Sequence, residues 1–202
     1  MLTSYDPTMK MVDARARYFE VNHFGQDGGY NDAWVDFKLG PLPMPFPNTA
    51  GRVKAVGYHD MHHVVTGYDT NTIGEFEISA WEIGAGCRDV AVAWVLNLSG
   101  MAGGLFAAPI RTFRAFVRGR RMETLYGRDL NVLLATPVGE VRALVTREEQ
   151  RPTSVTDVAL FTLAMSAGLV VGTAMLGLML VAAPIGLLTH ALRPKAAGPK
   201  TA

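Results

Sequence analysis

The apolar pattern of the chain is irregular at its N-terminal end. Polar and apolar residues are mixed over residues 1–20, and a short helix is expected around residues 10–19. Glycines mark turns between residues 21 and 48, where residues 18–21 and 34–37 are the expected short strands of a hairpin. The alternating prolines of residues 41–47 exclude a helix and favour an extended segment.

A helical pattern follows this segment. Asn48 or Thr49 can cap a helix that continues to about Thr66, and Gly67 suits the position just after its end. Tyr68 opens a short loop before the next helix.

That next helix is expected over residues 75–83. Thr72 and Glu75 have the spacing of a capping box, in which the Glu75 carboxylate would have less freedom to bind a metal ion. Residues 90–110 carry no charge, and we expect a buried helix there that ends near Gly100 in a glycine-rich turn.

A second helix of this region is expected from about Pro109. It is basic and amphipathic, which suits an anionic membrane surface, the pyrophosphate of a lipid precursor or a solvated face with ordinary ion pairs. Residues 129–142 predict a final pair of short elements, and residues 146–153 a polar linker.

The C-terminal part is the most apolar. Residues 158–192 contain no Asp, Glu, Lys or Arg, and as one helix they would extend about 52 Å. Because Pro184 interrupts the stretch, we expect a membrane-spanning helix over residues 156–183 and a short interfacial piece over 187–192. The small residues Ala164, Gly168 and Gly172 form a helix-packing stripe, through which a homodimer is one expectation.

The pattern as a whole predicts a mainly α fold: a compact helical domain with a turn-rich, hairpin-bearing N-terminal segment and a C-terminal transmembrane helix. The expected divisions are residues 1–48 for the N-terminal segment, 49–146 for the helical domain, 147–153 for the linker, 154–192 for the membrane anchor and 193–202 for a polar tail.

Composition narrows the classes of function. The 202-residue chain has a net charge of +1, which gives no sign of general nucleic-acid binding. Its single cysteine excludes an intrachain disulfide and a CxxC metal site. Residues 1–10 have no apolar core and do not resemble a secretory signal, so we expect the chain to begin in the cytoplasm or its equivalent.

Candidate chemistry concentrates in three histidines within five residues. On a helix that advances about 100° per residue, His59 and His63 lie about 40° apart, and with Asp60 they share an arc of about 100°. Two imidazoles with one or two carboxylates suit zinc or non-haem iron with open positions. His62 is equally well placed on the other side of His59, so helix geometry leaves two ligand sets open.

The segment HDMHHVVTGYDTNTIGE, residues 59–75, resembles the signature of the ubiquinone-biosynthesis family called coenzyme Q protein four. In that family a motif of the form HDxxH, eleven residues, E binds a metal ion. The resemblance, which covers about residues 50–145, implies His59, Asp60, His63 and Glu75 as ligands and leaves His62 outside the set.

The resemblance implies a membrane-associated protein that acts on a prenylated benzoate by oxidative decarboxylation of the ring. It implies an alternative as well, a non-enzymatic scaffold that holds the lipid for other enzymes of ubiquinone biosynthesis. Glu82 or Asp69 could transfer a proton; Glu82 could instead support a ligand or be a solvated surface acid. The arginine-rich helix suggests a third function, metal-dependent hydrolysis of a lipid phosphate.

The expected cofactor is therefore a divalent ion, zinc or iron. The expected partners are a prenylated quinone precursor, the membrane and other ubiquinone-biosynthesis proteins. The expected location is the bacterial inner membrane with the metal-binding domain in the cytoplasm, or the mitochondrial inner membrane in a eukaryote.

Overall fold

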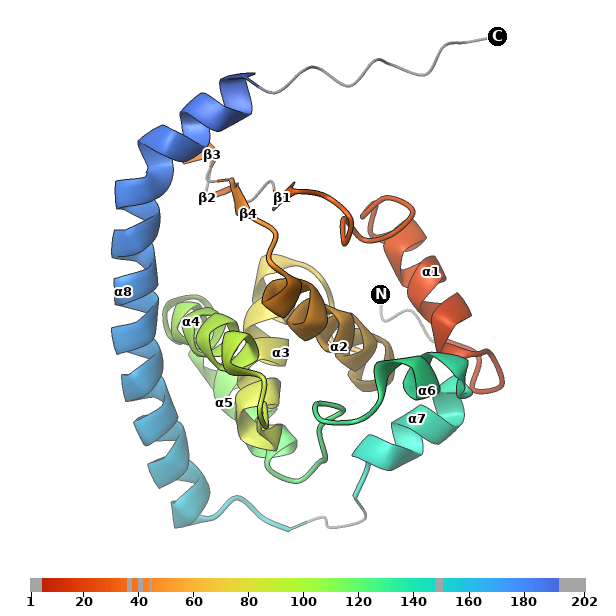
Figure 1. The fold of residues 1–202 in the computed structure, drawn as a ribbon. Coiled ribbons are helices and arrows are strands. Elements are labelled where there is room, and N and C mark those ends of the chain that lie inside the picture. The colour runs from red at the N-terminus through yellow and green to blue at the C-terminus, as the bar shows by residue number, and fades with distance from the viewer. Residues whose placement is uncertain (1–4, 36–37, 40–41, 44, 148–150, 193–202) are drawn as a thin grey trace, which may run out of the picture.

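The fold is mainly α-helical, as the sequence predicts, in a computed structural model that describes residues 5–35, 38–39, 42–43, 45–147 and 151–192 (Figure 1). The last helix is much longer than the others. The helices are α1 (Met11–Val21), α2 (Ala50–Thr66), α3 (Thr72–Ala85), α4 (Ala91–Ala107), α5 (Pro109–Gly119), α6 (Leu130–Ala135), α7 (Val138–Val145) and α8 (Val155–Leu192).

The strands are short and belong to the proline-rich segment. β1 (Trp34–Val35) pairs antiparallel with β4 (Phe46–Pro47), and β2 (Lys38–Leu39) pairs antiparallel with β3 (Leu42–Pro43). The extended chain predicted for this segment is confirmed where the structure describes it. Each described ladder is two residues long.

Of the two strands predicted for a hairpin, the one at residues 34–37 is found at Trp34–Val35 and pairs with β4, while residues 36–37 lie outside the described part of the chain. The strand predicted at residues 18–21 is wrong, because these residues form the last turn of α1. Met11, Ala14 and Tyr18 are buried at helical spacing, and α1 packs with this face against the rest of the core. A periodicity of three to four residues therefore overrides the local preference of the aromatic residues for strands.

Two predicted caps have different outcomes. Thr49 caps α2 by accepting a hydrogen bond from the Arg52 N–H, and Gly67 ends that helix in the left-handed conformation at φ 78°. The capping box predicted for α3 is wrong, because the helix begins earlier and Asn71 Oδ1 accepts from the Gly74 N–H at 3.0 Å. The Glu75 side chain is therefore not needed at the helix terminus.

The glycine-rich turn predicted near Gly100 is also wrong, since α4 continues to Ala107. Its glycines mark close helix contacts: a Cβ atom at Gly100 would collide with Ser79 of α3, one at Gly103 with Phe76, and one at Gly104 with Thr112 of α5. Gly residues in this helix thus bring α4 against α3 and α5, at some cost in helix propensity.

The helix α8 runs without a break through Pro184, contrary to the predicted division at that residue. A proline removes one backbone hydrogen bond, but a helix can continue through it when the residues on both sides remain helical. Figure 1 shows α8 as one long curved helix. Within it, Val155–Ile185 has a mean hydropathy of 2.1 and meets the length and composition of a membrane span.

The two halves of α8 have different surroundings. In the first half, Gly168 lies against the Leu98 carbonyl of α4, Gly172 lies near Ser99 and Ala102, and Phe161 packs edge-on against aromatic rings of α5. The small-residue stripe is thus a packing face within the chain, so a homodimer would require another surface. Beyond residue 172 most of the described side chains are exposed, including Leu176, Leu178, Leu180, Val181, Ile185, Leu188 and Leu192.

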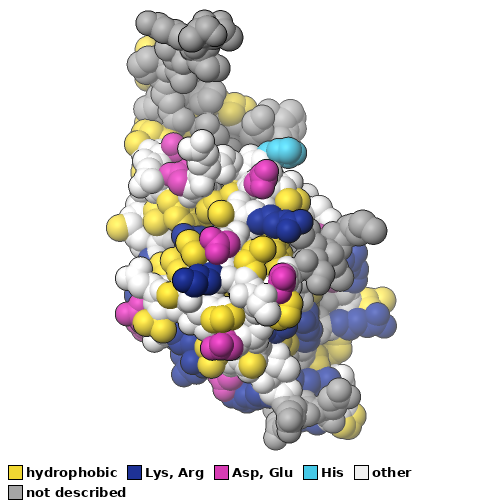
Figure 2. Space-filling view, turned by 90° about the vertical axis from the view of Figure 1, so that its right-hand side faces the viewer, with side chains coloured by type: hydrophobic (Ala, Val, Ile, Leu, Met, Phe, Trp, Pro, Cys, Tyr) yellow, Lys and Arg dark blue, Asp and Glu magenta, His cyan; other side chains and the backbone are white. Residues whose placement is uncertain are grey.

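Figure 2 shows the face on the opposite side of the molecule from α8. Basic and acidic side chains are interspersed there with apolar ones. The extended apolar surface of the described chain therefore lies along α8 and not on this face.

Candidate metal centre

The helices α2 and α3 bring three metal-ligating side chains together. His59 and His63 are one turn apart on α2, and Glu75 lies in the first turn of α3. His59 Nε2 is 3.2 Å from His63 Nε2 and 3.2 Å from Glu75 Oε2, and His63 Nε2 is 3.3 Å from Glu75 Oε1. Donor atoms about 2.0–2.1 Å from a tetrahedral ion lie about 3.3–3.4 Å apart. The spacing therefore suits an ion of the size of zinc.

Both imidazole rings are held by their second nitrogen. His63 Nδ1 lies 2.9 Å from the Tyr68 carbonyl oxygen, just after the turn at Gly67, and His59 Nδ1 lies 3.0 Å from Glu82 Oε1. These acceptors require a proton on each Nδ1, which leaves Nε2 as the ligand atom when a metal is bound. Without metal, burial lowers the pKa of His59, but the Glu82 and Glu75 carboxylates outweigh it and raise this pKa well above the ordinary value.

Glu82 lies behind the ligands and is fully buried. Its Oε1 accepts from His59 and from His62 Nδ1 at 2.7 Å, and its Oε2 accepts from the Tyr126 hydroxyl at 2.7 Å and from the Asn97 amide. Burial raises the pKa of Glu82, but His59 and His62 lower it further, so the carboxylate is ionised. The alternative that Glu82 is a solvated surface acid is wrong.

His62 is separated from the other two histidines although it lies between them in the sequence. Its Nδ1 bonds to Glu82, and its Nε2 accepts from the backbone N–H of Leu125 at 3.0 Å. Burial lowers the pKa of His62, and the ring is fully buried between Trp81 and Tyr126. Because both nitrogens have protein partners, His62 has no free ligand atom.

The remaining predicted residues lie outside the group of three. Asp60 is buried, its carboxylate accepts from the Tyr30 hydroxyl, and burial raises its pKa. Asp69 lies in the loop before α3 and lines a separate pocket of about 240 Å³. Among the residues that the structure describes, His59, His63 and Glu75 are the ones whose donor atoms all lie within 4.8 Å of one another. This group could hold a metal ion.

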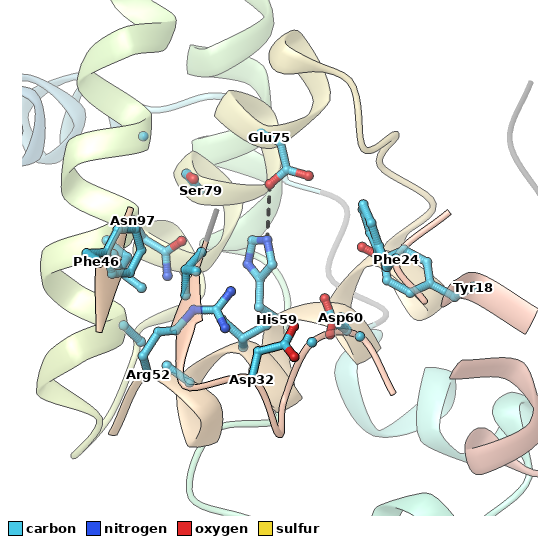
Figure 3. A pocket seen from close by; sticks show the side chains of 18 of the residues that line it. Tyr18, Phe24, Asp32, Phe46, Arg52, His59, Asp60, Glu75, Ser79 and Asn97 are labelled. Carbon is cyan, nitrogen blue, oxygen red and sulfur yellow. Dashed lines mark hydrogen bonds and ion pairs between the residues drawn. The ribbon is translucent and has the colours of Figure 1, made fainter. Parts of the chain in front are cut away.

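A larger pocket of about 740 Å³ adjoins this group, and His59 and Glu75 form part of its wall (Figure 3). Aromatic and aliphatic side chains from the N-terminal loops, β1, β4, α3 and α4 make up much of the lining: Phe24, Trp34, Val35, Phe46, Phe76 and Leu96. Figure 3 shows Glu75 above the His59 ring, with Asp60 to one side and Arg52 near the other. The pocket thus combines an apolar wall with a polar, potentially metal-binding end.

The sequence did not single out several residues of this site. Arg52 could have been predicted from its spacing. It precedes His59 by seven residues, or two helical turns, and therefore lies on the same face of α2. Asn97 and Tyr126 reach Glu82 from a distant helix and a loop, and no local spacing indicates such contacts.

The arginines of the basic helix α5 do not line the large pocket. Arg111 pairs with Glu77, and Arg118 donates to the Thr66 carbonyl. Arg120, the residue that follows the end of α5, pairs with Asp157. These contacts hold α5 against α3, α8 and α2, and no described arginine of α5 lies in the wall next to His59 and Glu75.

Comparisons of the chain with models of protein families, with curated proteins and with solved structures find no match.

Proposed function

We propose that the chain is a membrane-bound, metal-dependent enzyme that acts on a prenylated benzoate by oxidative decarboxylation. The bond between the ring and the carboxyl carbon breaks, CO2 leaves and a hydroxyl group forms on the ring carbon, while O2 takes up the two electrons and, with water supplying the remaining atoms, is released as H2O2. The observation that carries the proposal is the group His59, His63 and Glu75 at the polar end of an apolar-walled pocket. The motif that resembles the ubiquinone-biosynthesis family contributes the substrate class and the reaction.

In this proposal the protein side chains have separate tasks. His59, His63 and Glu75 hold the ion, which when bound supplies Lewis-acid chemistry and, if it is iron, redox chemistry as well. Glu82 fixes the orientation of His59 from behind. The aromatic and aliphatic wall shields the head group from water and accommodates the start of an apolar tail.

The alternative function is a scaffold that holds the same lipid without reacting. A closed structural zinc site usually has four protein ligands. Three donor atoms gather here among the described residues, which favours an ion with an exchangeable position over a closed one. An exchangeable position on the ion would allow the lipid to bind in both functions. The scaffold and the enzyme therefore differ only in whether the bound lipid is converted to a product.

The different surroundings of the two halves of α8 support the proposed membrane location. The first half packs on α4 and α5, and its buried Asp157 bonds to Arg120 Nε at 2.7 Å and to the Ser154 N–H at 3.0 Å, so lipid cannot surround it. Residues 173–192 extend about 30 Å as a helix, the thickness of the hydrocarbon core. We place this second half in the bacterial or mitochondrial inner membrane and the metal-binding domain on the cytoplasmic side or its mitochondrial equivalent.

The function is tested by what co-purifies with the protein. Full-length protein is purified in mild detergent from cells that make ubiquinone, and metal and lipid are identified by mass spectrometry for wild type and for His63→Ala. The proposal expects a prenylated benzoate or quinone in wild type and its loss with the metal in the variant. The same lipid at equal amount in the metal-free variant favours the scaffold, and turnover of an added prenylated benzoate by wild type would exclude it.

The location is tested by ending the chain after Gly172. We expect this shortened protein to leave the membrane fraction in a high-salt wash, while the full-length chain stays. A shortened protein that is folded and still resists the wash would show that another surface binds the membrane.

A further inference from the structure

Arg52 is a cation in the pocket wall that forms no ion pair with any acidic side chain the structure describes, although the Asp60 carboxylate is near enough to interact with it electrostatically. It lies in the first turn of α2, is half-buried, and donates from Nη1 to Asn48 Oδ1 at 3.1 Å. Within the described part of the chain it forms no ion pair, whereas Arg88, Arg111 and Arg120 each do. In Figure 3 its guanidinium points toward the His59 side of the pocket.

A guanidinium has five N–H donors, and one of those of Arg52 is occupied by Asn48. Partial removal of an unpaired cation from water is costly unless an anion or other acceptors compensate. Burial lowers the pKa of Arg52 by more than the nearby Asp60 carboxylate raises it, although an arginine stays charged. The remaining donors are therefore available to an anionic ligand in the pocket.

The other charges of the pocket wall make such binding depend on the metal. Three carboxylates line the pocket together with Arg52: Asp32, Asp60 and Glu75. Without a divalent ion these three carboxylates outnumber the single guanidinium of the wall, which disfavours an anion there. A divalent ion at His59 and Glu75 offsets this excess and adds a second cationic group to the same wall as Arg52.

We propose that Arg52 binds the carboxylate of the pocket's ligand beside the metal centre, so that the pocket selects amphipathic acids over neutral lipids of the same shape. The planar guanidinium matches a carboxylate with two parallel hydrogen bonds, which an amide or a single ammonium cannot reproduce. This inference rests on the proposed function, since it takes the metal and the acidic head group from it. Arg52 is a specificity-determining residue in this account.

The test uses full-length protein loaded with Co²⁺ in detergent, with 4-decyloxybenzoate as the probe and 4-decyloxybenzyl alcohol as its neutral counterpart. Binding is followed by equilibrium dialysis at constant detergent and by the visible spectrum of the cobalt. Wild type is expected to bind the acid, to bind the alcohol at least about tenfold more weakly, and to lose acid binding when the cobalt is removed.

Arg52→Gln is expected to weaken acid binding about 10- to 100-fold with unchanged cobalt binding, and Arg52→Lys to weaken it less. The matched control is Lys54→Gln, which removes an exposed charge from the same helix outside this pocket and is expected to bind like wild type. Equal acid binding by Arg52→Gln and wild type, or equal binding of acid and alcohol, overturns the inference while leaving the metal centre intact. If wild type binds no cobalt, the proposed function fails and the inference falls with it.

Discussion

Replacement of Glu82 by glutamine is expected to lower the free energy of unfolding by an amount that follows from the hydrogen bonds of its carboxylate. The fully buried carboxylate accepts four of them, from His59, His62, Tyr126 and Asn97. In Glu82→Gln the amide oxygen can accept two hydrogen bonds. The NH2 group takes the place of the other oxygen and, being a donor, cannot accept hydrogen bonds from the donors that face it. At least two buried donors therefore lose their acceptor, at about 1–3 kcal/mol each, which predicts a loss of about 2–6 kcal/mol in the free energy of unfolding.

The assay is urea unfolding of the metal-free protein in mild detergent, followed by circular dichroism, with the loss taken from the shift of the midpoint at constant slope. The matched control is Glu77→Gln on the same helix. Glu77 is partly buried and accepts two hydrogen bonds from the exposed Arg111, one of which a glutamine can still accept, so its replacement should cost about 1 kcal/mol. If the two variants lose equal stability, the buried carboxylate does not organise the site as argued.

The other predictions concern the ligand set and the packing of α8. Glu75→Gln should weaken Zn²⁺ binding more than about 100-fold and Asp60→Asn less than about tenfold, as measured by competition with a chelator, because Asp60 bonds to a tyrosine outside the group of three; equal effects would restore Asp60 as a ligand. His62→Asn should keep one metal ion per chain in metal analysis but lower the free energy of unfolding by about 2–3 kcal/mol, because both ring nitrogens have buried partners. Gly168→Ala should lower the free energy of unfolding, measured by thermal unfolding, by about 1–3 kcal/mol, since its Cβ would lie 2.6 Å from a backbone carbonyl of α4. Gly177→Ala has open space around its Cβ and should change this free energy little, so equal losses in the two variants would contradict this packing.

The sequence predicted the elements whose signals are local. The cap at Thr49, the turn at Gly67 and the spacing of His59 and His63 lie within one helix, and each is confirmed as an element of α2. Glu75 is different, because no spacing on one helix indicates it. It was expected from a family resemblance, and the structure brings it to the two histidines.

Contacts between distant segments explain where the sequence led to a wrong or an incomplete prediction. A turn was predicted at Gly100 because a glycine often marks one. Here the glycine is needed because Ser79 of α3 packs against it. The position of His62 could not be decided because its partners, Glu82 and the Leu125 amide, lie 20 and 63 residues away along the chain. The stripe at Gly168 correctly indicated a packing face, but the residues that fill it belong to α4.

The metal content of freshly purified, full-length protein and of His63→Ala shows directly whether His59, His63 and Glu75 form a metal centre. We expect about one zinc or iron ion per chain in wild type and a loss of nearly all of it in the variant, with the helical circular dichroism spectrum retained. His63 provides one of three donors, and its ring is held by the Tyr68 carbonyl rather than by the core network around Glu82. Wild-type protein without metal, or a variant that keeps its full content, would contradict the claim that these side chains form a metal centre.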